Sequence, residues 1–118
     1  MKTDPQPLLP LTVAAQHILL ALSDEDRHGY GIMQEVARQS AGKYKMGSGT
    51  LYDNLEKLIE QGLVAESPRR FAREDPRRRY YRMTGFGRRV FSAEVARLEA
   101  IVRQAKLRLS GARPKEAL

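Results

Sequence analysis

The stretch "MGSGTLYDNLEKLIEQGLV", residues 46–64, joins small flexible residues to a tyrosine and a ladder of leucines, without a plausible catalytic acid, base or metal cluster. Gly47-Ser48-Gly49-Thr50 reads as a break followed by capping hydroxyls, and Gly62 reads as a stop, so we predict a helix between them. Its expected buried side consists of Leu51, Leu55, Leu58 and Ile59. Its other side presents Thr50, Tyr52, Asp53, Asn54 and Lys57. A helix anchored in this way can lie in a DNA major groove and read base edges.

The length and composition set the frame for that helix. A chain of 118 residues is the size of one ordinary domain. It contains no cysteine, which excludes disulfides and thiolate metal sites and fits a reducing compartment. Three prolines make residues 1–10 an expected flexible arm, and the apolar stretch that follows is too short to cross a bilayer. We therefore expect a soluble, cytoplasmic protein that does not engage a membrane.

Positive charge is concentrated in one segment. The net charge of the chain is +7 and its isoelectric point is about 10.1. Between Arg69 and Arg82, "RRFAREDPRRRYYR" holds seven arginines against Glu74 and Asp75, so most of the excess lies there. Such a cluster fits a polyanion, although charge alone is equally compatible with a membrane surface or a solvated, self-repelling loop.

Two further helices are expected before residue 46. The first begins at the capping residue Thr12 and buries a stripe consisting of Leu11, Ala15, Ile18, Leu19 and Leu22. Val13, His17 and Leu20 continue the apolar surface around another side, which suits either a second subunit or burial in the same domain. The second helix lies within "HGYGIMQEVARQSAGKY" and stops at Ala41-Gly42.

Two strands are expected after Gly62, at residues 63–67 and 79–84, with the arginine-rich loop between Pro68 and Pro76 at the tip of the hairpin. Three helices followed by a basic hairpin is the order of a winged helix-turn-helix. The fold class that we predict is therefore mainly α with a small β-hairpin. The DNA-binding domain is expected to span residues 11–84.

Three segments of the sequence resemble the sequences of one known family. "HGYGIMQEV" at 28–36, "GTLYDNLEKLIEQGLV" at 49–64 and "RRYYRMTGFGRRVF" at 78–91 resemble the PadR-type transcriptional regulators, which are winged-helix DNA-binding dimers of prokaryotes. The resemblance implies that Tyr52 touches the DNA backbone. Asp53 departs from the proline that often follows this tyrosine. Combining resemblance and charge, the expected DNA-binding residues are Lys43, Lys45, Ser48, Thr50, Tyr52, Asn54, Lys57, Arg69, Arg70, Arg73, Arg77, Arg78 and Arg79.

The last helix is expected at residues 85–109, capped by Thr84, with a disordered tail at 110–118. An apolar seam with a period of 3.5 predicts packing against another helix, either within the chain or in a second copy. The seam consists of Phe91, Val95, Leu98, Val102, Ala105 and Leu109. We favour a homodimer, to which Val13, His17 and Leu20 contribute, and the resemblance points the same way. A small aromatic or lipophilic effector is a possible ligand between the subunits.

The sequence contains no residue pattern that is typical of an enzyme's active site. His17 and His28 are the only histidines, no catalytic triad can be assembled, and no cofactor or metal is expected. Glu35, Glu56 and Glu60 are expected on exposed helix faces, where they serve solubility. We predict a sequence-specific DNA-binding regulator, most simply a repressor acting as a homodimer on two half-sites. The alternative is a winged-helix module for non-specific nucleic-acid binding or protein interaction.

Overall fold

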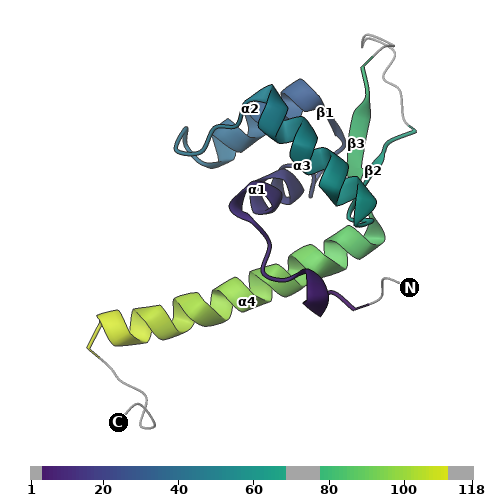
Figure 1. The fold of residues 1–118 in the computed structure, drawn as a ribbon. Helices are drawn as coiled ribbons and strands as arrows, with labels where there is room; N and C mark the ends of the chain where they lie inside the picture. The colour runs from purple at the N-terminus through teal and green to yellow at the C-terminus, as the bar shows by residue number, and fades with distance from the viewer. Residues whose placement is uncertain (1–3, 69–77, 112–118) are drawn as a thin grey trace.

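The computed structural model describes residues 4–68 and 78–111, which form helices around a small sheet and end in one long helix (Figure 1). The predicted class, mainly α with a small sheet, is confirmed. The elements are η1 (Gln6–Leu8), α1 (Val13–Ala21), β1 (Arg27–His28), α2 (Gly29–Gln39), α3 (Ser48–Glu60), β2 (Val64–Glu66), β3 (Tyr80–Met83) and α4 (Gly85–Leu109).

Side-chain caps start three of these helices. The hydroxyls of Thr12 and Thr84 accept hydrogen bonds from the amides of Ala15 and Gly87, at 3.1 and 2.9 Å, so both predicted caps are confirmed. His28 caps α2 through its Nδ1. The prediction of capping hydroxyls before α3 is wrong, because Gly47 occupies the cap position and makes no side-chain bond. Helix α3 therefore already includes Ser48 and Thr50.

The sheet is antiparallel, with β3 in the middle and the strand order β1-β3-β2. Val64 pairs with Met83 and Glu66 with Tyr81, which confirms the predicted pairing of the two later strands. β1 was not predicted, and its residues Arg27 and His28 pair with Tyr81 and Tyr80. The predicted hairpin tip at residues 69–77 and the predicted tail beyond residue 111 lie outside the described residues. The sheet thus ties the start of α2 to the base of the hairpin.

The core lies between α1, α2, α3 and the first half of α4. Leu51, Leu55 and Leu58 of α3 are buried as expected, whereas Ile59 is 42% exposed and does not belong to the buried side. Gly62 ends the turn after α3 with a φ of +79°, a left-handed conformation that a glycine adopts without strain. The other fully buried large side chains include Ile18, Leu19, Ile32, Val36, Leu63, Val64 and Val90.

The segment before α1 lies against α4 rather than extending away from it (Figure 1). Glu94 of α4 is fully buried, and its carboxylate accepts hydrogen bonds from the Leu11 amide at 2.8 Å, Gln16 Nε2 at 3.0 Å and Arg97 Nε at 2.6 Å. The bond from Arg97 contributes most to lowering the pKa of Glu94, and burial opposes it. With the bonds from Gln16 and Leu11, the pKa falls from 4.5 to about 2. Glu94 thereby holds the start of α1 on α4.

Candidate nucleic-acid interface

Helix α3 presents a polar face that its buried leucines hold in place. Ser48, Thr50, Tyr52 and Lys57 are exposed. Asn54 is half-buried, and its Nδ2 donates to the carbonyl oxygen of Thr50 at 2.8 Å, one turn back along the helix. The amide keeps its Oδ1 and a second N–H. The structure thus brings together the residues that the sequence predicted for this helix, with donors and acceptors facing outward.

Tyr52 borders a groove of about 390 Å³. Tyr81 of β3 and the first residues of α2 line it together with Arg78 and Arg79 at the base of the hairpin. Burial raises the pKa of Tyr81, and the neighbouring Tyr52 raises it further, against a lowering by Arg79. The hydroxyl of Tyr81 therefore remains protonated at neutral pH and can donate a hydrogen bond. Two arginines and three tyrosines line this groove, since Tyr30 borders it as well, which makes it a suitable neighbour for a polyanion.

His28 connects the start of α2 to the hairpin base. Its Nδ1 accepts from the Gly31 amide at 3.0 Å, and its Nε2 lies 2.9 Å from an Arg78 guanidinium nitrogen. A neutral imidazole has one acceptor nitrogen, so the two contacts require opposite tautomers of the ring. The ring also meets Tyr80 edge-on, with 5.3 Å between ring centroids. The sequence predicted no role for this histidine. The signal that could have found it is its position directly before a helix, where an imidazole can serve as a cap.

The loop before α3 carries Lys43 and Lys45, both exposed. Tyr44 between them turns inward and stacks on His17 of α1, with 4.5 Å between ring centroids and 9° between ring planes. Gln39 donates to the His17 carbonyl at 2.9 Å. His17, which we predicted at a subunit contact, is therefore half-buried within its own chain and braces the lysine loop. Of the predicted arginines, Arg69, Arg70, Arg73 and Arg77 lie outside the described residues.

The predicted subunit contact is largely exposed apolar surface. Val13 and Leu20 of α1 are exposed, as are Val95, Val102, Ala105 and Leu109 of α4, while Phe91 and Leu98 are half-buried. Sequence reasoning missed Ile101 and Leu107, which lie outside the seam and are exposed as well. The apolar surface of α4 is therefore wider than the predicted seam.

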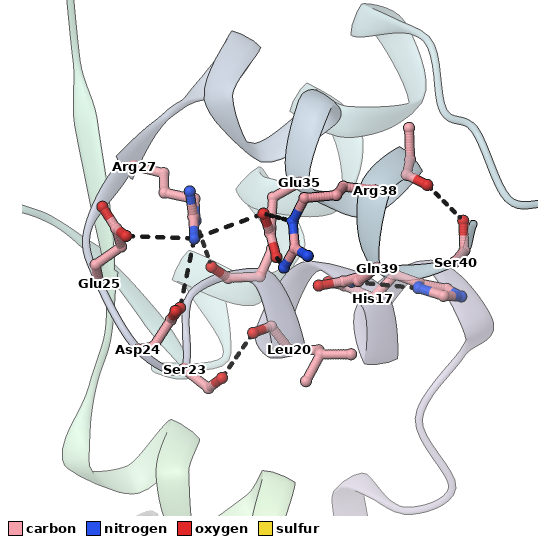
Figure 2. A network of polar contacts seen from close by, with 12 residues as sticks. His17, Leu20, Ser23, Asp24, Glu25, Arg27, Glu35, Arg38, Gln39 and Ser40 are labelled. Atoms are coloured by element: carbon pink, nitrogen blue, oxygen red, sulfur yellow. Dashed lines mark hydrogen bonds and ion pairs between the residues drawn. The ribbon is translucent and has the colours of Figure 1, made fainter. Parts of the chain in front are cut away.

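A second polar cluster lies between the end of α1 and α2 and has a structural role (Figure 2). Arg27 reaches Asp24 and Glu25 at 3.5 Å and Glu35 at 3.7 Å, and its Nε donates to the Ala21 carbonyl at 2.7 Å. Glu35 also pairs with Arg38, and this hydrogen bond is the main reason why the pKa of Glu35 is lowered. The expectation that Glu35 lies on an exposed face is wrong, since its side chain is only 12% exposed. The ion pairs join the end of α1 to α2.

No helix within residues 4–68 and 78–111 has the length and apolarity needed to cross a membrane. In the same residues no group of three or more histidines, cysteines or carboxylates is arranged to hold a metal ion.

Helices α1 to α3, the three-stranded sheet and the long α4 define a winged helix-turn-helix protein. Residues 18–93 match the Transcriptional regulator PadR-like family, and the chain belongs to that family. Transcriptional regulator Rv3488 of Mycobacterium tuberculosis is 33% identical over 88 residues, which cover 75% of this chain and 78% of the relative. Membership in the PadR-like family confirms the resemblance that the sequence showed. It also confirms the prediction that the chain is not an enzyme, because the family consists of transcriptional regulators.

Solved structures agree on the fold. A PadR family transcription regulator from Clostridium difficile R20291 has a TM-score of 0.70 at 19% identity, over 83% of this chain and 99% of that one. Bacillus subtilis PadR in complex with operator DNA has a TM-score of 0.61 at 19% identity, over 73% of this chain and 48% of that one. At this level of identity the two likenesses establish the winged-helix fold.

Proposed function

We propose that this PadR-like regulator is a sequence-specific DNA-binding protein that acts as a homodimer on an operator with two half-sites, most simply as a repressor. The observation that carries the proposal is the geometry of α3. Three buried leucines fix its apolar side, and its polar side faces outward beside Tyr52, Arg78 and Arg79. A rigid helix with an outward donor and acceptor face is the element that reads base edges in helix-turn-helix proteins.

The residues divide into two roles. Thr50 and Asn54 carry the hydrogen-bonding groups that suit base edges, and Asn54 retains an acceptor and a donor beyond its bond to Thr50. Lys43, Lys45, Lys57 and the arginines carry charge without base-specific geometry, which suits phosphates. Support comes from the Bacillus subtilis PadR structure, which has the same fold and is a complex with operator DNA.

The exposed apolar residues of α1 and α4 support the homodimer. Val102 and Leu109 are 49% and 88% exposed, and such surface on a long helix is typical of a contact with another helix. A two-fold dimer presents two copies of α3, so its operator should contain two related half-sites about one helical turn apart or a multiple of it. A dimer bound across a promoter would exclude polymerase by occupying the site.

Selection from a random library of DNA duplexes tests the proposal without knowledge of the operator. The expected result is convergence on an inverted repeat that binds at least about a thousandfold more tightly than its scrambled version. Absence of convergence, with binding retained, would instead support the alternative of a non-specific or protein-interaction module.

Two variants then separate the roles on the selected and the scrambled duplex. Asn54→Ala should weaken binding to the selected duplex by about 1–3 kcal/mol per lost base contact and leave the scrambled duplex nearly unaffected. Arg78→Ala should weaken both duplexes alike and flatten the logarithmic salt dependence by about one unit per phosphate contact, or about two per dimer. Fluorescence anisotropy at several salt concentrations measures both effects. Equal losses on both duplexes for Asn54→Ala would contradict base readout by this residue.

A further inference from the structure

Gly29 is the first residue of α2, and the end of the Tyr52 side chain rests on it. A Cβ atom placed on Gly29 would lie 2.2 Å from the Tyr52 hydroxyl oxygen and 2.8 Å from the ring carbon that bears it. Both distances are far below the separation of about 3.5–4.0 Å at which such atoms attract. No residue with a side chain at position 29 is compatible with Tyr52 in this orientation.

We infer that Gly29 is a positioning residue, which holds the Tyr52 hydroxyl at the edge of the Arg78–Arg79 groove, where it contacts the DNA backbone. This inference rests on the proposed function. The tyrosine and both arginines border the same groove, so a phosphate that reaches one of these groups is close to the others. The resemblance to the family implied a role for Tyr52, but the sequence did not indicate what holds its ring in place.

The relative rigidity of the two partners predicts which one yields. The Tyr52 side chain is 48% exposed, and the atoms that would collide are at its free end. Helix α2, in contrast, is anchored by Ile32 and Val36, which are fully buried. A methyl group at position 29 should therefore turn Tyr52 out into solvent and leave α2 in place. The fold should persist while the groove loses its tyrosine.

Gly85 supplies a matched control. It is the first residue of α4, as Gly29 is of α2, and it too follows a side-chain cap. A Cβ atom on Gly85 would meet nothing within 4 Å. Gly85→Ala thus makes the same chemical change at the same helix position, away from Tyr52.

The test is a double-mutant cycle with Gly29→Ala, Tyr52→Leu, the double variant and Gly85→Ala. Binding to a fluorescein-labelled 24-base-pair duplex of mixed sequence is followed by anisotropy at low salt, and thermal melting is recorded in parallel. We expect Gly29→Ala to weaken binding about tenfold, as Tyr52→Leu does, because each loses the hydroxyl contact. The double variant should bind like Tyr52→Leu alone, and Gly85→Ala like the wild type. The melting temperature of Gly29→Ala should be close to that of Gly85→Ala.

Three results would overturn the inference. Gly29→Ala could bind like the wild type, it could weaken binding by the same factor in the Tyr52→Leu background, or it could melt far below Gly85→Ala. The last result would show that α2 yields rather than Tyr52.

Failure of the proposed function has a different signature, namely a wild-type protein that does not bind the duplex at all. The seating of Tyr52 is then decided on the free protein by nuclear Overhauser effects between the Gly29 Hα protons and the Tyr52 ring protons. Their presence supports the positioning, and their absence overturns it.

Discussion

The two halves of α4 have opposite surroundings within the same continuous helix. In the first half, Gly87, Val90 and Glu94 are buried against the rest of the chain. In the second half every residue from Glu99 to Leu109 is exposed, including Ile101, Val102 and Leu109. Figure 1 shows this half extending away from the other helices. The first half therefore belongs to the core of its own domain.

The second half carries exposed apolar residues without an intrachain partner among the described residues, and apolar surface that stays in water contributes nothing to the folding of a lone chain. We propose that a second copy covers it. The difference shows how one helix can both complete a small DNA-binding domain and join two of them, and each half can be disrupted separately.

The largest expected effect is on the apolar seam where it enters the second half of α4. Leu98→Glu combined with Val102→Glu would bury charges in an apolar contact, at a cost of several kcal/mol for each charge that stays unpaired. Sedimentation velocity at about 10 µM should show a monomer that retains the helical content of the wild type. Ala96→Glu combined with Ala100→Glu adds the same charge to the opposite side of the helix and should leave the dimer intact. A dimer that survives Leu98→Glu combined with Val102→Glu would show that a second copy does not pack on this seam.

The second largest effect is expected in the first half of α4, where Gly87 lies against the backbone of Leu63. A Cβ atom on Gly87 would lie 2.1 Å from the carbonyl oxygen of Leu63, an oxygen that also accepts the Thr84 amide at 3.1 Å. Backbone cannot turn aside as a side chain can, so Gly87→Ala should lower the free energy of unfolding by about 3 kcal/mol, the upper end for overpacking. Urea denaturation measures the loss. Gly85→Ala is the control, and equal midpoints for the two variants would refute the close approach.

A smaller loss is expected for Glu94→Gln, because an amide cannot accept all the hydrogen bonds that the carboxylate accepts. We expect about 2 kcal/mol lower stability at pH 7, with Glu99→Gln, an exposed site on the same helix, near wild type. The pKa of Glu94 is lowered by folding, so its contribution is present above pH 4.5 and is lost as the pH falls towards 2. Denaturation curves between pH 7 and pH 2 should therefore converge for wild type and Glu94→Gln. A difference in the free energy of unfolding that stayed constant over this pH range would mean that the charge of Glu94 does not cause it.

The smallest effect should come from the far end of the seam. Leu109 is 88% exposed and lies in the last turn, where helices fray, so a second copy can cover only part of it. Leu109→Ala should weaken dimerisation about fivefold, equivalent to about 1 kcal/mol. A dilution series followed by sedimentation detects such a change. Complete loss of the dimer would instead place the contact at the helix end rather than along the seam.

Features that depend only on residues close together in the chain could be predicted from the sequence. The bounds of α4, its Thr84 cap and the stop at Gly62 followed from capping residues and helical spacing, and the structure reproduces them. The buried leucines of α3 followed from periodicity in the same way. These signals lie within a few residues of each other, so a single sequence contains them in full.

Features that depend on distant segments were missed. β1 is only two residues long, too short for an alternating pattern, and forms because β3 pairs with it. We did not predict the burial of Glu94, which depends on hydrogen bonds from Leu11 and Gln16 of a distant segment as well as from an arginine of its own helix. The close approach of Gly29 to Tyr52 joins two helices and leaves no mark in either segment alone. In each case the partner is remote in sequence.

The sedimentation equilibrium mass of the wild-type protein tests most directly the claim that the second half of α4 is covered by a second copy. Between 1 and 50 µM we expect a single species of twice 13.4 kDa. A species of 13.4 kDa across that range would contradict the homodimer, because the exposed apolar residues of the second half of α4 would then lie in water without a partner.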